Sequence, residues 1–200
     1  MKKKYKLVDT QMQDINTKIK ADTVLFFDMD GTLVDTNLAN FLSYKKSIHT
    51  VLKSDHNLIY NPDKRFNRSN LKSAIPNLSG IEYERIVQEK EEIYTDFLPE
   101  TKLNKVIADI LFKYSKTNKT ILVTNSRKER ALATLSHFGL TERFNNIFYR
   151  QFSDKKTNKY LNAISSLDIS PNSILLFENE EQEIEDAIVA GIPTNNILSL

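Results

Sequence analysis

Three short apolar runs constrain most strongly how this chain can fold. They are TVLFFD (23–28), TILVTN (120–125) and SILLFEN (173–179). Each run is hydrophobic without alternation, and each ends in polar residues. Continuous hydrophobicity over so few residues is typical of strands that are covered on both faces, as in a parallel sheet. We therefore predict three buried parallel strands.

Helical patterns separate these strands. The run TILVTN is followed by SRKERALATLSHFGL, in which Ser126 and Glu129 have capping-box spacing and Gly139 is expected to end the helix. A second helix follows SILLFEN and should end at Gly191, before a short last strand near residues 197–198. This alternation predicts an α/β fold, a Rossmann-like doubly wound parallel sheet.

The segment between the first two strands has a helical pattern of apolar residues and no further strand-like run. Residues 36–53 and 79–98 have apolar side chains at helical spacing, and Ser79 and Glu82 form another predicted capping box. The link at 60–70 mixes turn formers with charges, which indicates a loop before a short helix around residues 71–75.

We interpret this segment as an inserted domain. The expected organisation is a Rossmann-like core formed by residues 1–35 and 99–200, with a small α-helical cap at 36–98. A unit of that size is too small to be more than a lid on its host.

Composition excludes several classes of function. The 200 residues are 40% hydrophobic and carry a net charge of +2, which provides no general electrostatic attraction to nucleic acid or to anionic membranes. The absence of cysteine excludes disulfides and thiolate chemistry. No apolar run approaches the ~20 residues of a membrane span. We expect a cytoplasmic protein without nucleic-acid or membrane partners, and nothing in the sequence indicates its oligomeric state.

The polar residues that end the three predicted strands form a candidate site. In a doubly wound sheet, ligands bind at the carboxyl ends of the strands. There Asp28 can act as a nucleophile on phosphorus, while Asp30 protonates the leaving group and then activates water. Such a site needs a cation, for which Mg²⁺ suits oxygen ligands such as the carboxylate of Glu178. The Thr124 hydroxyl, the main chain near Asn125 and a lysine would hold the phosphate.

Three motifs resemble those of a known family. DMDGTLVDT (28–36) resembles motif I of the haloacid dehalogenase-like (HAD) hydrolase superfamily, and LVTNS (122–126) resembles motif II. LLFENEEQEIEDAIVAGI (175–192) is similar to motif IV and the helix that follows it. The insert after motif I resembles a C1 cap, as in the phosphatase and β-phosphoglucomutase-like branch.

The resemblance implies specific roles for these residues. Asp28 would be the nucleophile and Asp30 the general acid/base. Mg²⁺ would be held by the Asp28 carboxylate, the main-chain carbonyl of Asp30 and the acids of motif IV. An acid at position 30 also argues against dehalogenation, because the dehalogenating members of the family lack it.

Two positions depart from the family pattern or leave a choice open. Motif IV often reads Glu-Asp, whereas here Glu178 is followed by Asn179. Asn179 can still bind Mg²⁺ through its amide oxygen or hold a metal-bound water, but it removes a negative charge, so we expect weaker Mg²⁺ binding. Glutamates at 180, 181 and 183 are alternative ligands. For the family's phosphate lysine we favour Lys159, at the start of a predicted helix, with Lys155 and Lys156 as alternatives.

The predicted function is magnesium-dependent hydrolysis of a small phosphorylated metabolite through an aspartyl phosphate. A phosphomutase of the β-phosphoglucomutase kind and a non-catalytic binding module on the same scaffold are the alternatives. The sequence does not indicate which phosphorylated substrate is used.

Overall fold

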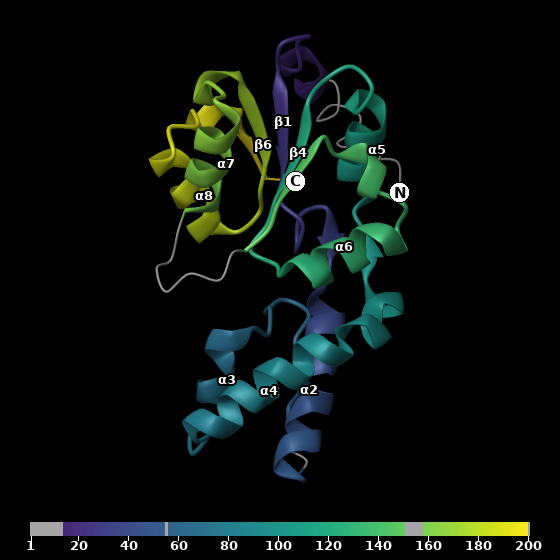
Figure 1. The fold of residues 1–200 in the computed structure, drawn as a ribbon, viewed down its shortest axis with the longest axis vertical. Helices are drawn as coiled ribbons and strands as arrows, with labels where there is room; N and C mark the ends of the chain where they lie inside the picture. Colours follow the sequence, from purple (N-terminus) through teal and green to yellow (C-terminus); the bar gives the residue numbers. More distant parts are fainter. Residues whose placement is uncertain (1–13, 55, 151–157, 200) are drawn as a thin grey trace.

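A five-stranded parallel sheet forms the centre of the computed structural model, which describes residues 14–54, 56–150 and 158–199. The strand order is β5-β4-β1-β6-β7 (Figure 1). The strands are β1 (Val24–Phe27), β4 (Thr120–Val123), β5 (Asn146–Phe148), β6 (Ile174–Phe177) and β7 (Ile197–Leu198). All four neighbouring pairs are parallel, which confirms the predicted doubly wound α/β fold.

Helices cover both faces of this sheet. Figure 1 shows α5 (Lys105–Tyr114) and α6 (Lys128–His137) on one side, and α7 (Lys159–Leu167) and α8 (Glu181–Val189) on the other. The side chains of adjacent β1 residues therefore pack on opposite faces of the sheet, in two different hydrophobic clusters. Phe27 packs in the cluster that includes Ile107 of α5, while Phe26 packs with Tyr160 of α7. Burial on both faces explains why the strand is hydrophobic without alternation.

Three helices between β1 and β4 gather at one end of the molecule (Figure 1). They are α2 (Asn37–Leu52), α3 (Arg68–Ala74) and α4 (Gly80–Ile93), and they enclose a hydrophobic cluster of their own. The chain enters and leaves this helical segment through an antiparallel pair, β2 (Val34–Asp35) with β3 (Lys102–Leu103). The 3₁₀ turn Tyr94–Glu100 connects α4 to β3.

The local signals for helix ends were partly right. The Ser79 and Glu82 capping box at the start of α4 is confirmed, and Gly139 has φ of 65° after α6, as a helix-ending glycine should. Helix α3 begins at Arg68, earlier than predicted, because Asn67 caps it in a capping box with Asn70. The pair β2 and β3 and the strand β5 were not predicted, since runs of two or three residues carry little periodicity.

The predicted cap of α6 was wrong. The N-cap position is Arg127, which makes no side-chain capping bond, and Ser126 lies one residue earlier. Ser126 is buried, and its hydroxyl donates a hydrogen bond to Asp30. The serine therefore serves the strand-end site instead of the helix.

Across the described ranges, no helix combines the length and the apolar character that crossing a membrane requires.

Candidate active site

The carboxyl ends of three strands bring the central residues of the site together. Asp28 follows β1, Thr124 follows β4 and Glu178 follows β6, and β1 lies between the other two strands. All three side chains are buried. Gly31, with φ of 87°, lets the chain turn away from the sheet after Asp30. The sequence-predicted strand ends thus meet at one edge.

Lys159 links two of these carboxylates. Its Nζ lies 2.8 Å from Asp28 Oδ1 and 3.1 Å from Glu178 Oε2, with Glu183 Oε2 at 3.3 Å. Lys159 is the first residue of α7, which is capped by the Asn158 side chain. Lys159 was favoured as the phosphate lysine because it was predicted to lie at the start of a helix, and the structure places it there. The alternatives Lys155 and Lys156 fall within 151–157, outside the described residues.

Burial and the charges of neighbouring residues together set the pKa values of Asp28 and Lys159. Burial raises the pKa of Asp28 to about 7, although Lys159 acts in the opposite direction. Burial alone would lower the pKa of Lys159, but Asp28, Glu178 and Glu183 raise it above its ordinary value, so the amine stays charged. Tyr160 donates its hydroxyl to Glu178, and the main-chain N–H groups of residues 179 and 180 donate to the other oxygen of Glu178.

Asp30 is surrounded by donors. Its Oδ1 accepts from the Thr36 hydroxyl at 2.7 Å, and its Oδ2 accepts from Ser126. Arg130 lies 3.3 Å and Arg65 3.6 Å from Oδ2. Burial alone would raise the pKa of Asp30, but the two arginines and the two hydroxyls hold it well below its usual range. Asp30 is therefore ionised at neutral pH, whereas the Asp28 carboxyl titrates near pH 7.

The predicted polar residues after β4 and β6 differ in burial and in hydrogen-bond partners. Thr124 is buried, and its hydroxyl accepts from the main-chain N–H of Ser126 at 3.1 Å. Asn125 is exposed and donates to Glu183 Oε1 at 2.9 Å. Asn179 donates to the Gly31 carbonyl at 3.1 Å, so its amide supports the turn after Asp30.

A single small pocket collects most of the predicted site residues. Its lining residues are Asp28, Asp30, Arg65, Thr124, Asn125, Arg130, Lys159, Glu180 and Glu183. Glu178 and Asn179 do not line it. Glu178 accepts from the lining residue Lys159, and Asn179 donates to the carbonyl of Gly31, the residue after Asp30.

Sequence reasoning missed the two arginines of this pocket. Arg65 lies in the charged link that was predicted to be a loop before a short helix. Arg130 lies in the first turn of α6, shortly after the polar end of β4, and this short distance in sequence from the strand end is the signal that could have identified it. Both reach Asp30 from elements that follow it by tens of residues.

The donor chemistry of the site fits a hard cation. Asp28 and Glu178 both contact Lys159 Nζ, so their oxygens are close together, and the Asp30 carbonyl belongs to the same turn. In the part of the chain that the structure describes, no group of three or more His, Cys, Asp or Glu side chains is arranged to hold a metal ion. A cation here would therefore take two carboxylates and a main-chain oxygen, a set suited to Mg²⁺ with its remaining waters.

The chain is similar to several known proteins. A phosphorylated carbohydrates phosphatase from Thermotoga maritima is 28% identical over 178 residues, covering 84% of this chain and 81% of that protein. The structure of CbbY from Rhodobacter sphaeroides, in complex with phosphate, matches with a TM-score of 0.70 and 19% identity, covering 88% and 84% of the two chains.

A further solved structure, from Thermotoga maritima, is described as a candidate β-phosphoglucomutase. It matches with a TM-score of 0.61 and 23% identity, covering 88% of this chain and 83% of its own. At these identities the two solved structures establish the fold. The model of the family described as haloacid dehalogenase-like hydrolase matches residues 25–197. The chain therefore belongs to the haloacid dehalogenase-like hydrolase family.

Proposed function

We propose that this protein is a magnesium-dependent phosphatase that hydrolyses a small phosphorylated metabolite through an aspartyl phosphate on Asp28. The observation that carries the proposal is the contact between Lys159 and Asp28 at 2.8 Å, with Asp30 in the same pocket. A nucleophile, an acid/base and a phosphate-binding cation thus share one cavity. The carbohydrate substrates in the name of the Thermotoga phosphatase suggest a sugar phosphate.

The first step would be attack of an Asp28 oxygen on phosphorus. The Thr124 hydroxyl, the Lys159 amine and the main-chain N–H groups after β4 would bind the phosphate oxygens. The bond from phosphorus to the ester oxygen would break, and Asp30 would give that oxygen a proton. In the second step Asp30 would take a proton from water, whose oxygen attacks the phosphorus and releases Asp28 and inorganic phosphate.

The protonation state of Asp30 suits the second step directly. Arg130 and Arg65 keep this carboxylate ionised, as a base requires. For the first step Asp30 must hold a proton. A substrate phosphate would compete for the two arginines, and weaker contacts with them would raise the pKa of Asp30.

Asp28, the Asp30 carbonyl and Glu178 would hold Mg²⁺, with Asn179 contributing its amide oxygen or orienting a bound water. When bound, the ion would neutralise charge on the phosphate and favour the ionised form of Asp28.

The helical segment would act as a cap. We propose the division into a core of residues 1–35 and 99–200 and a cap of residues 36–98. Arg65 supports this role, because it extends from the segment to Asp30 at 3.6 Å and to Glu180 at 3.1 Å. Closure over the substrate would exclude bulk water.

Substitution of the nucleophile tests the proposal. With Mg²⁺ and a panel of sugar phosphates, Asp28→Asn should retain less than about 1% of wild-type turnover. Asp109→Asn, on the exposed face of α5, is the matched control and should keep full activity. Turnover by Asp28→Asn at the wild-type rate, or wild-type turnover that persists after chelation of divalent metal, would contradict the proposal.

A phosphomutase is the second candidate, favoured only by the likeness to the candidate β-phosphoglucomutase. A time course of free phosphate separates the two functions. A phosphatase releases one phosphate for each substrate consumed, whereas a mutase returns the group to the sugar.

A further inference from the structure

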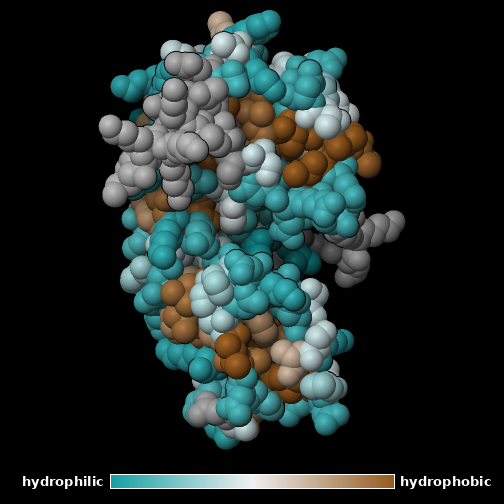
Figure 2. Space-filling model, turned by 180° about the vertical axis from the view of Figure 1, so that it is seen from behind, coloured by the Kyte–Doolittle hydropathy of each residue, from teal (hydrophilic) through white to brown (hydrophobic). Residues whose placement is uncertain are grey.

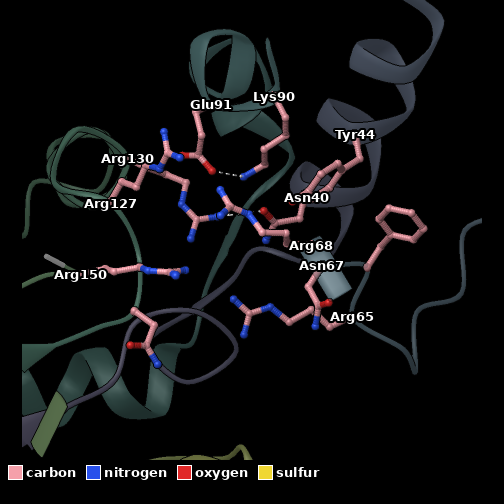
Figure 3. A pocket seen from close by; sticks show the side chains of 12 residues that line it. Asn40, Tyr44, Arg65, Asn67, Arg68, Lys90, Glu91, Arg127, Arg130 and Arg150 are labelled. Carbon is pink, nitrogen blue, oxygen red and sulfur yellow. Dashed lines mark hydrogen bonds and ion pairs between the residues drawn. The ribbon is translucent and has the colours of Figure 1, made fainter. Parts of the chain in front are cut away.

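A second cavity lies beside the proposed catalytic pocket, and half of its twelve lining residues are basic. Its volume is about 140 Å³. Six of its lining residues are basic: Arg65, Arg68, Lys90, Arg127, Arg130 and Arg150. Figure 3 shows Arg65 and Arg150 extending into the same space from different elements. Figure 2 shows hydrophilic surface between the apolar patches of the upper and lower parts of the molecule.

This arginine cavity continues the catalytic pocket. Arg65, Asn125 and Arg130 line both spaces. One end of a bound molecule can therefore contact Asp28 while the remainder extends towards the helical segment. A ligand of this kind would touch the core through Arg150 and the segment through Arg68.

The cations of the cavity outnumber the acids available to them. Arg65 and Arg130 share Asp30, Arg65 also pairs with Glu180, and Lys90 contacts Glu91 Oε1 at 3.4 Å. Arg68 and Arg150 form no ion pair with a carboxylate of any described residue. Two positive charges thus face the cavity without a counter-charge in the described ranges.

Lys90 adds a charge that the fold itself disfavours. Its side chain is 1% exposed and lies against the rings of Tyr94 and Tyr44, with centroids at 4.5 and 5.5 Å. Burial lowers the pKa of Lys90 to about 7. Beside it, Arg130 Nε is buried and makes no hydrogen bond within the described structure. These donors are costly to bury unless an acceptor reaches them.

We propose that the substrate is a bisphosphate, whose second phosphate binds in the arginine cavity while the first lies at Asp28. Two unpaired guanidinium groups match the charge of one phosphate dianion, and their planar donors can hold its oxygens in pairs. A carboxylate would balance only half of that charge. This inference rests on the proposed phosphatase function and specifies its substrate class.

Equilibrium binding tests the inference without depending on turnover. Isothermal titration of the full-length Asp28→Asn variant with Mg²⁺ would compare a hexose bisphosphate, its two monophosphates and phosphoglycolate, which carries a carboxylate as its second anion. The bisphosphate should bind at least about tenfold more tightly than either monophosphate, as one charge-assisted contact requires. Equal affinities, or tighter binding of phosphoglycolate, would overturn the proposal.

The cavity arginines give the second arm of the test. Arg68→Gln in the same background should lower the ratio of bisphosphate to monophosphate affinity about tenfold. Lys72→Gln, an exposed lysine of α3 outside the cavity, should leave the ratio unchanged. If Arg68→Gln no longer unfolds cooperatively on heating, Arg150→Gln is used in its place. A ratio unchanged by both arginine variants would place the second phosphate elsewhere and refute the site.

Turnover by the wild-type protein distinguishes the two proposals. Hydrolysis of monophosphates without selective bisphosphate binding would leave the phosphatase function standing and remove this inference. Selective bisphosphate binding without hydrolysis of any phosphoester would refute the phosphatase function and leave only the binding site for the second phosphate.

Discussion

The guanidinium of Arg130 lies 3.3 Å from Asp30 Oδ2, although the two residues are 100 positions apart in the chain. The same arginine donates to Asn40 Oδ1 at 3.0 Å and lies over the ring of Tyr94. It therefore connects a helix of the core, the turn after β1 and the helical segment. A buried carboxylate at Asp30 depends on this cation for its charge.

Arg130→Gln should destabilise the protein. Removal of one partner of a buried ion pair leaves Asp30 with less compensation, for a loss of about 3 kcal/mol in the free energy of unfolding. Urea denaturation at neutral pH measures it. Lys128→Gln, on the exposed face of the same helix, should change stability by no more than about 0.5 kcal/mol. A change this small for Arg130→Gln would show that Arg65 and the hydroxyls of Thr36 and Ser126 stabilise the charge of Asp30 without Arg130.

Stability without metal should decline as pH rises from about 4 to about 7. The pKa of Asp28 is about 7 in the fold and near 4 in the unfolded chain, so in this window the folded state binds more protons. The decline is at most about 4 kcal/mol. Urea denaturation across this pH range in a chelator measures it.

Asp28→Asn should remove this decline, because the amide does not titrate. Mg²⁺ should weaken it in the wild-type protein by favouring the ionised carboxylate. An identical pH dependence in wild type and Asp28→Asn would mean that another group causes it.

Asn179→Asp should strengthen Mg²⁺ binding and weaken the metal-free fold. The added carboxylate restores a charge near Asp28 and Glu178, for about tenfold tighter binding. The amide that donates to the Gly31 carbonyl at 3.1 Å is lost, and two acceptors then face each other. We expect a cost of about 1–2 kcal/mol in the presence of a chelator.

Calorimetric Mg²⁺ titration and urea denaturation measure these two effects of Asn179→Asp. Asn195→Asp adds the same charge on an exposed turn before β7, at the opposite edge of the sheet, and should alter neither. Unchanged Mg²⁺ affinity in Asn179→Asp would place residue 179 outside the metal site.

Ser79→Ala should lower stability by about 1 kcal/mol without changing turnover. The Ser79 hydroxyl caps α4 by accepting from the Glu82 N–H at 3.2 Å, and the Glu82 carboxylate accepts from the Ser79 N–H at 3.0 Å. Thermal unfolding and steady-state kinetics on the same preparation provide the measurement. A loss of activity larger than the loss of folded protein would link the position of α4 to the reaction.

Much of the core could be predicted because its signals are local. Leu25, Phe26 and Phe27 form an apolar run that only a strand buried on both faces accommodates. The strand ends followed from that run, and parallel strands place their carboxyl ends at one edge. Lys159 could be chosen because Asn158 is a strong helix cap.

The contacts that the polar residues make in the folded protein could not be predicted from the sequence. Ser126 has the spacing of a helix cap, yet its hydroxyl donates to Asp30, because a buried carboxylate needs donors more than an exposed helix end does. Arg65 and Arg68 lie in the link that was predicted to be a loop, but the packing of α2, α3 and α4 presents both to the cavity. No periodicity encodes a contact between a loop and a distant strand end.

The sequence by itself therefore determined the α/β sheet, the polar residues that end its strands and the choice of Asp28, Asp30, Thr124 and Lys159 as candidates. Only the tertiary structure decided which charges compensate one another. Burial and the arrival of Arg130 and Arg65 separate the pKa values of Asp28 and Asp30, two acids that are alike in sequence. The physical reason is that the free energy of a buried charge depends on its neighbours in space, most of which are remote in the chain.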